Sequence, residues 1–355
     1  MRVLGPEELG EGDRERWREL RAVSKAPRNP FMEPEFSVAV ARVRPRARVA
    51  VLYEGASPAG FLPYERGVLG QGRAIGLGVS DCQGAVLAPG TAVEAGELLR
   101  GCAVSSFAFD NLEAGQGLFT PYAAERHATY VIDVEKGYAS YESALRTRSP
   151  KFLRTTLAKE RRLGRQVGAV RFVFDERDPA ALGTLIGWKS AQYRRTGRRD
   201  RFAREWIARL VGRLAETRSA QCAGTLSVLY AGDRPVAAHF GLRSASVLAC
   251  WFPAYDPEFA KYSPGLVLHL RMAGAAAAEG IGLLDMGRGP AEYKDSLKTG
   301  ELTVYEGTAT RPGVGSALHR LGREPARRAH GFVRTRPRLA ALAARALKGA
   351  GRLRP

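Results

Sequence analysis

Residue types suited to acid–base chemistry gather between residues 239 and 294. His239 lies in the run PVAAHFGL, whose small residues leave room for a ligand, and an imidazole can act as a general base near neutral pH. Tyr255 and Asp256 end the apolar run that follows, and strand ends of α/β proteins often face a ligand cleft. We therefore expect His239 and Asp256 to be catalytic and Tyr255 to contact substrate. The alternatives are a core histidine and a simple Asp-Pro turn.

A second group follows the next short apolar segment. Asp285 and Arg288 close that segment among glycines, and Tyr293 and Lys294 come soon after. Lys294 could stabilise an oxyanion or bind a phosphate, and Tyr293 could protonate a leaving thiolate. Asp285 and Arg288 are expected to contact substrate. The alternative for Lys294 is a structural pair with Asp285 or Asp295.

The loop between these groups opens directly onto a helix. Ser263 is expected as the N-cap and Pro264 as the first helical residue. A helix N-terminus carries unpaired N–H groups and a partial positive charge, which suit a phosphate. Lys261, Tyr262, Ser263 and Gly265 are therefore predicted to bind a cofactor, with Lys261 supplying neutralising charge. An ordinary capped helix start is the alternative.

One predicted helix upstream could supply a further wall. Lys189 and Tyr193 are four residues apart in the segment 179–193, so they share a helical face. We expect both to contact substrate. In the alternative, Tyr193 packs in the core and Lys189 is solvated.

The elements that must position these groups run strand, loop, helix, strand over residues 247–294. Both halves of the chain repeat the order helix, helix, hairpin, strand, helix, strand. We predict an α/β (α+β) fold of two tandem domains, each a mixed sheet flanked by helices. The expected boundaries are 1–145, 146–310 and a basic tail at 311–355. The expected helices are 7–25, 35–42, 91–102, 137–145, the early part of 146–168, 179–193 and 203–217, and the expected strands include 48–53, 59–64, 105–112, 129–134, 170–174, 225–230, 235–242, 247–253, 281–286 and 302–308.

Composition narrows the class of protein. The 355 residues are 45% hydrophobic and 26% charged, as in a folded globular chain. No apolar run approaches the roughly 18 residues that span a bilayer. The N-terminus lacks the apolar core of an export signal. Four cysteines are scattered without CxxC spacing, which predicts neither a zinc site nor a disulfide framework. We expect a cytoplasmic protein without a metal.

The net charge of +19 is concentrated toward the C-terminus, where residues 311–355 hold twelve Lys/Arg and one acid. Such a balance favours polyanionic or anionic-surface partners, namely nucleic acid, acidic phospholipid or phosphate-bearing cofactors. The alternative is a basic surface that is simply solvated. The segment 332–350 contains LAALAARAL, which could form an amphipathic helix peripheral to an acidic membrane. A docked or frayed C-terminal helix is the alternative. The basic stretches 146–165 and 194–201 could hold tRNA or an anionic lipid, but few aromatics interleave with the charges, which favours a solvated face over nucleic-acid binding.

Four stretches together resemble a known group. They are SPKFLRTTLAKERRLG (149–164), WKSAQYRRTG (188–197), PVAAHFGL (235–242) and YDPEFAKYSPGLVLHL…DMGRGPAEYK (255–294). They are similar to GNAT-superfamily acetyltransferases of the cellulose- and exopolysaccharide-biosynthesis type, related in fold to Fem-type aminoacyl transferases. The resemblance implies two GNAT-like domains, the second binding acetyl-CoA or another acyl-CoA. The usual pyrophosphate loop Q/R-x-x-G-x-G/A is absent, which leaves the donor open.

The resulting hypothesis is an acyltransferase that moves an acyl group, acetyl by first expectation, from acyl-CoA to an amine or hydroxyl of a sugar or cell-envelope precursor. Direct attack is expected because no serine or cysteine lies in a nucleophile elbow. Two alternatives stay open. One is a Fem-type enzyme that uses aminoacyl-tRNA, and the other is a non-catalytic GNAT-like module in polysaccharide assembly.

Overall fold

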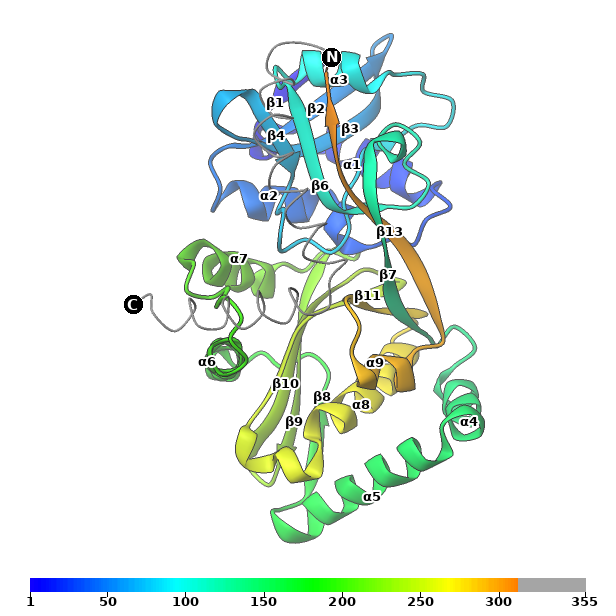
Figure 1. Cartoon of the computed structure of the whole chain (residues 1–355), viewed down its shortest axis with the longest axis vertical. Helices are drawn as coiled ribbons and strands as arrows, with labels where there is room; N and C mark the ends of the chain where they lie inside the picture. The colour runs from blue at the N-terminus through cyan, green and yellow to red at the C-terminus, as the bar shows by residue number, and fades with distance from the viewer. Residues whose placement is uncertain (312–355) are drawn as a thin grey trace, which may run out of the picture.

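A single mixed sheet of thirteen strands runs through the described part of the chain, residues 1–311, in the computed structural model (Figure 1). Its strand order is β1-β2-β3-β4-β6-β13-β7-β12-β11-β10-β9-β8, with β5 paired to β3. The strands are β1 (Arg2–Leu4), β2 (Ala47–Glu54), β3 (Ser57–Arg66), β4 (Gln71–Ala74), β5 (Val86–Leu87), β6 (Ser106–Glu113), β7 (Ala123–Asp133), β8 (Val170–Val173), β9 (Ala223–Ala231), β10 (Arg234–Arg243), β11 (Val247–Tyr255), β12 (Leu283–Arg288) and β13 (Gly300–Thr310).

The helices form where apolar residues recur at helical spacing. In α7, for example, Ile207, Leu210, Val211 and Leu214 are all buried, which is one face of the helix. The α-helices are α1 (Glu11–Ala22), α2 (Pro34–Ala41), α3 (Ala95–Gly101), α4 (Tyr138–Arg148), α5 (Pro150–Gln166), α6 (Pro179–Arg195), α7 (Glu205–Glu216), α8 (Pro264–Ala278) and α9 (Glu292–Leu297), and the 3₁₀ turns are η1 (Pro6–Glu8), η2 (Pro30–Met32), η3 (Val68–Gly70), η4 (Thr120–Tyr122) and η5 (Pro257–Tyr262).

The two halves of the chain arrange their strands in the same way from each edge of the sheet to its centre. At the centre the two halves exchange their last strands. In each half a hairpin leads to a strand that pairs in parallel with the strand after the next helix, β4 with β6 and β11 with β12. Yet β7, which follows β6 in sequence, pairs with β12, and β13, which follows β12, pairs with β6. β7 and β13 also pair with each other. Figure 1 shows β13 rising from the later half into the earlier one.

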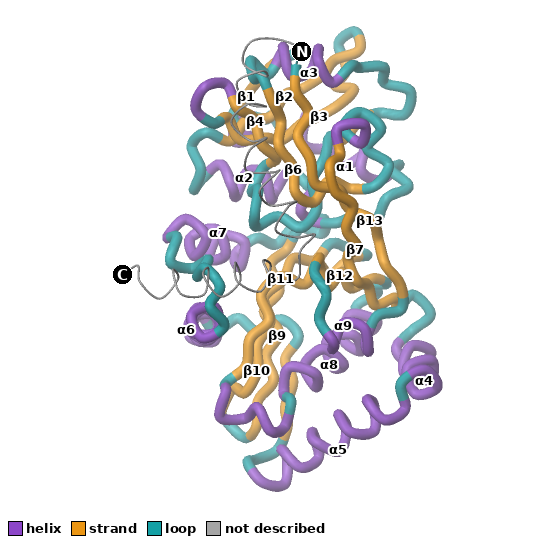
Figure 2. Tube along the Cα trace, viewed as in Figure 1, coloured by secondary structure: helices purple, strands orange, loops and turns teal. Residues whose placement is uncertain are grey.

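Helices cover both faces of the later half of the sheet. Val228 of β9 packs in the same core cluster as residues of α6 and α7, whereas its neighbour Leu229 packs with residues of α5 and α8. Successive residues of a strand point to opposite faces, so α6 and α7 lie on one face and α5 and α8 on the other. Figure 2 shows these two sets of helices on either side of β9–β11.

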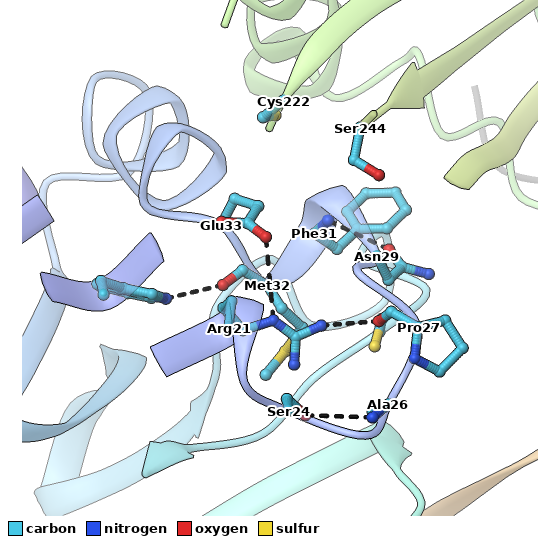
Figure 3. A network of polar contacts seen from close by, with 12 residues as sticks. Arg21, Ser24, Ala26, Pro27, Asn29, Phe31, Met32, Glu33, Cys222 and Ser244 are labelled. Carbon is cyan, nitrogen blue, oxygen red and sulfur yellow. Dashed lines mark hydrogen bonds and ion pairs between the residues drawn. The ribbon is translucent and has the colours of Figure 1, made fainter. Parts of the chain in front are cut away.

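Aromatic and polar contacts join the two halves near η2. The ring of Phe31 lies 5.1 Å from that of Trp251 in an edge-to-face arrangement. Asn29 Nδ2 donates to Asp285 Oδ2 at 3.3 Å. Figure 3 shows this region, where Glu33 and the buried Arg21 face each other beneath the later half. The later half's β11 and β12 are therefore fixed against the earlier half.

Most expected elements are present. The largest difference is that the strands of the two halves form one continuous sheet, because β7 and β13 are exchanged between the halves. Every predicted helix and strand named above has a counterpart within a few residues, including a start of α8 at Pro264. Within residues 1–311 no helix is long and apolar enough to cross a membrane. The boundary at residue 145 stays a prediction, and the tail 311–355 with its segment 332–350 lies almost wholly outside the described residues.

Candidate active site

The two parallel strands β11 and β12 pair along only three residues. Val247–Ala249 face Leu283–Asp285, and beyond that point the ladder stops although both strands continue. A cavity of about 620 Å³ occupies the gap. Residues of α6 and of α8 both line it, so it connects the two faces of the sheet. A ligand could thus enter the gap from either face.

The sequence gives physical reasons for the divergence. Pro253 in β11 has no N–H to donate, so it weakens pairing along that strand. Gly287 in β12 has φ +73°, a conformation that favours glycine, and the register of β12 against β7 shifts between Asp285 and Arg288. The strand bends away at this bulge, which leaves main-chain edges facing the cavity.

The first turn of α8 forms one wall of this cavity. Ser263 lines it in the left-handed conformation with φ 49°, and its side chain makes no capping hydrogen bond. Ser263 is the N-cap residue and Pro264 the first residue of α8, as predicted, but the Ser263 side chain does not bond to the backbone of the first turn. Instead its Oγ accepts a hydrogen bond from Lys159 Nζ at 2.7 Å. Gly265, a predicted cofactor contact, also lines the cavity.

His269, which the sequence reading missed, lines the same wall. Its Nδ1 lies 2.7 Å from the carbonyl oxygen of Gly265, so Nδ1 carries the proton of the neutral ring and Nε2 is left as an acceptor. Burial lowers the pKa of His269, which keeps the ring neutral. Tyr293 lies beside it at 5.3 Å between ring centroids. The available signal was the four-residue spacing from Gly265, which puts both residues on one helical face.

Tyr293 and Lys294, which the sequence predicts to be catalytic, line the cavity from α9. Burial raises the pKa of Tyr293 to about 12, so its hydroxyl stays protonated and can donate. Lys294 Nζ donates to the carbonyls of Gly287 at 2.9 Å and Arg288 at 3.2 Å. Two of its three donors thus hold the turn after β12, and one remains for a ligand. The alternative reading, a structural pair of Lys294 with Asp285 or Asp295, is not formed among the described residues.

The α6 wall carries Lys189 and Tyr193, which both line the cavity. Lys189 Nζ donates to Gln192 Oε1 at 3.0 Å and to the carbonyl of Pro253 at 2.8 Å. Burial, together with the charges of Arg198 and Arg201, lowers the pKa of Lys189 to about 8. Tyr255 lines the opposite side. All three residues predicted to contact substrate thus lie on one cavity, and their contact with substrate stays a prediction.

The cavity also has an acidic side chain, Asp81, which comes from the earlier half of the chain. Asp81 is half-buried, lines the cavity, and makes no hydrogen bond or ion pair with any residue in the range 1–311. A Cβ on Gly287 would lie 3.3 Å from its Oδ2, so the carboxyl is against the backbone of β12. Burial, aided by the charge of Asp285, raises the pKa of Asp81 to about 7. A carboxylate with such a pKa is a suitable general base.

The segment that carries Asp81 also closes the matching gap in the earlier half. There β4 pairs with β6 only as far as Arg73 with Ala108. Beyond this point Gln83 takes the vacant edge: its N donates to the carbonyl of Asn111, and its Oε1 accepts from the N–H of Asp110. The gap between β4 and β6 is therefore filled by the chain itself, while the gap between β11 and β12 is open.

Three predicted catalytic or substrate residues do not reach the cavity. His239 is fully buried, and its Nε2 accepts from the N–H of Trp251 at 3.1 Å. Asp256 caps η5 by accepting from the N–H of Glu258. Asp285 accepts from the N–H of Gly287 and from Asn29 Nδ2, and it does not line the cavity. We correct these assignments because each group satisfies the protein's own backbone or core.

Two predicted cofactor contacts also lie elsewhere. Tyr262 is buried and its hydroxyl donates to Gln166, and Lys261 stacks over the Tyr262 ring at 5.0 Å. Neither lines the cavity. Lys159, from the helix α5, supplies the cation beside the start of α8 instead. Arg288 does line the cavity, but its guanidinium is engaged by Glu306 and by the carbonyl of Asp110.

Among residues 1–311 no group of His, Cys, Asp or Glu is arranged to hold a metal ion. The four cysteines, all within this range, are free and buried. The polar groups on the cavity are suited to acid–base chemistry on an organic substrate.

Comparison with known families covers the part of the chain that builds this gap. Residues 151–295 match the model of a family described as "Acetyltransferase (GNAT) domain". The match contains β11, α8, β12 and most of α9, so it covers the two diverging strands and the helices beside them. No curated protein matches the chain.

Solved structures resemble nearly the whole chain in fold. FemX is similar with a TM-score of 0.60 at 10% identity, over 90% of this chain and 99% of that one. A conserved protein of unknown function from Bacteroides thetaiotaomicron has a TM-score of 0.54 at 13% identity, covering 86% and 98%. The C-terminal domain of a putative lysylphosphatidylglycerol synthetase from Agrobacterium fabrum has a TM-score of 0.52 at 13% identity, covering 86% and 94%. The predicted fold class, mixed sheets and helices in two tandem GNAT-like parts, is confirmed.

Proposed function

We propose that this protein transfers an acyl group, acetyl in the first instance, from acyl-CoA to an amine or hydroxyl of a sugar or cell-envelope precursor. The observation that carries the proposal is the open gap between β11 and β12, which reaches both faces of the sheet within a GNAT domain. Two substrates approaching from opposite faces could meet there without a covalent enzyme intermediate.

The α8 face suits the donor. Main-chain edges of β11 and β12 beyond Ala249 and Asp285 form no ladder with each other. Those edge groups that Lys189 and Lys294 do not engage can pair with the amides of an extended donor chain. The start of α8, with Gly265 on the cavity and Lys159 beside Ser263, suits the donor's phosphates. A groove of about 480 Å³ that includes Lys151 and Lys159 adjoins this end.

The α6 face suits the acceptor, and Asp81 lies within reach of that side. In the proposed step the acceptor nitrogen or oxygen attacks the thioester carbon, and its proton passes to the Asp81 carboxylate. The new C–N or C–O bond forms, the C–S bond breaks, and CoA leaves as a thiolate. Tyr293, whose hydroxyl stays protonated, donates a hydrogen bond to the departing sulfur.

The test is acetyl-CoA binding by calorimetry, together with CoA release in the presence of amino-sugar acceptors. Gly265→Leu should raise the donor KM strongly, because a side chain there points toward Tyr255 at the cavity wall. Gly183→Leu, at an exposed helical glycine with open space around it, is the matched control. An unchanged donor KM in Gly265→Leu would remove the donor from this site.

A second candidate is transfer from aminoacyl-tRNA. Lys151, Arg154, Arg161 and Arg165 are exposed on α5, and the one acid of this helix, Glu160, is buried and bonded to Arg271. Such a face favours a polyanion. Tight tRNA binding that weakens steeply with salt and with charge reversal on α5, combined with failure to bind acetyl-CoA, would favour this donor.

A further inference from the structure

We propose that the acceptor carries an anionic group, and that Arg198 and Arg201 bind it while Asp81 receives the proton of the attacking group. This rests on the proposed function and specifies its acceptor class. The shared chemistry is a phosphate monoester or a carboxylate on the same molecule as the nucleophile.

The first observation is that these two guanidiniums are uncommitted. Arg198 and Arg201 line the cavity and are exposed, and neither side chain has a hydrogen bond or ion pair with residues 1–311. The other cations on the cavity are engaged by the protein: Lys189 and Lys294 by backbone carbonyls and Arg288 by Glu306. Two free planar donors at one rim suit bidentate binding of an oxyanion.

The loop's own acid does not neutralise them. Asp200 Oδ2 accepts from the Ser190 hydroxyl, and its Oδ1 accepts from the N–H of Phe202 at 2.9 Å. These bonds tie the loop to α6 and brace the segment that presents Arg198 and Arg201. The rim thus keeps a net positive charge that an incoming anion would offset.

The position of the rim separates it from the donor's phosphates. Arg198 and Arg201 follow α6, whereas the start of α8 lies on the other face of the sheet. The donor phosphates already have Lys159 and the α8 N-terminus on their own face. Cations on the opposite face are therefore available to the second substrate.

The second observation is that Asp81 is the one carboxyl among the described residues that line the cavity, and it is free. Burial raises the pKa of Asp81 and the charge of Arg201 opposes this rise, although no hydrogen bond or ion pair joins Asp81 and Arg201. A free carboxyl and a free cationic pair on the lining of one cavity match a molecule that carries an amine and an anion. Phosphorylated and carboxylated amino sugars have this combination.

The test compares three acceptors with acetyl-CoA as donor: glucosamine, glucosamine 6-phosphate and muramic acid. We expect the wild type to show a kcat/KM at least 10-fold higher for one or both anionic sugars than for glucosamine. A preference for the phosphate alone or for the carboxylate alone identifies the source of the anion. Equal values for all three, or no detectable binding of either anionic sugar to the CoA complex, would overturn the inference.

Variants locate the effect. Arg201→Ala and Arg198→Ala should each raise the KM of the anionic sugar about 10-fold or more, since charged hydrogen bonds contribute about 1.5–3 kcal/mol. The donor KM and the KM of glucosamine should change less than twofold. Arg199→Ala, an exposed arginine of the same loop that does not line the cavity, is the matched control. If the donor KM rises instead, the cations serve the donor and the inference fails, while the proposed function stands. Failure of acetyl-CoA to bind at all would instead remove the proposed function.

Discussion

The imidazole Nδ1 of His269 lies 2.7 Å from the carbonyl oxygen of Gly265, one turn earlier on α8. This bond joins the side chain on the cavity to the backbone of the turn that would receive the donor phosphates. His269 therefore acts as a positioning residue for that turn, and its neutral state follows from the burial that lowers its pKa.

We expect His269→Ala to raise the donor KM about fivefold, because one such hydrogen bond contributes about 1 kcal/mol. His269→Asn should retain most of the affinity, since its amide can donate in the place of Nδ1. The kcat at saturating donor should fall less than the KM rises. Steady-state kinetics of the two variants side by side check this, and equal losses in both would contradict the positioning role.

Asp81→Asn should lower kcat/KM by about 10²–10⁴-fold if Asp81 is the base. The wild-type rate should rise with pH through about 7, where the carboxyl loses its proton, and level off above that. In Asp81→Asn this acidic limb should disappear while acetyl-CoA binding is retained. Asp110→Asn tests whether another nearby carboxyl produces the limb. A limb that persists unchanged in Asp81→Asn would exclude Asp81 as its source.

The sequence predicted the elements that local patterns determine, but not the contacts between residues that are far apart in the chain. The strand, loop, helix and strand of 247–294 followed from local periodicity, and Tyr293 and Lys294 reached the cavity because they lie just after β12. Asp81 could not be found this way, because it enters the cavity from a loop of the other half, some 200 residues away in sequence. The prediction that His239 faces a cleft failed for a related reason. The small neighbours that seemed to leave a cleft are filled by packing, and a Cβ on Gly241 would clash with the His239 ring.

Glu33 supports a prediction about stability. Its side chain is fully buried, neither carboxylate oxygen has a hydrogen-bond partner in residues 1–311, and Arg21 is 4.0 Å away (Figure 3). Burial raises the pKa of Glu33 to about 7. The unfolded carboxyl ionises near 4.5, so the folded state loses stability as pH rises from about 4.5 to about 7.

Glu33→Gln should remove that loss, so its free energy of unfolding should exceed that of the wild type at pH 8 by on the order of 1–3 kcal/mol. The difference between the two should shrink toward pH 5. Urea denaturation at both pH values measures it. Glu7→Gln, at an exposed acid, should show no such pH-dependent gain. A wild type that is the more stable at pH 8 would mean that Arg21 compensates the buried charge.

The exchanged strands predict how the two halves depend on each other. In the intact chain β13 fills the space between β6 and β7, while β7 also pairs with β12. A fragment of residues 1–148 would lose β13 and β12, leaving both edges of β7 and the inner edge of β6 unpaired. Exposed edges of this kind favour aggregation. We therefore expect fragment 1–148 to be insoluble alone and to become soluble when it is co-expressed with fragment 149–355.

The matched comparison divides the chain where no strand is exchanged. A break between Gly232 and Asp233 cuts the β9–β10 hairpin, whose two strands belong to the same half. The first fragment then keeps β6 and β7, and the second keeps β12 and β13, so the exchanged strands can still pair when both fragments are present. Size-exclusion chromatography and hydrogen exchange on the co-expressed pairs should show β6, β7 and β13 protected together. If fragment 1–148 folds alone with β6 and β7 protected, they find partners within their own half, and the exchange of strands is not what stabilises it.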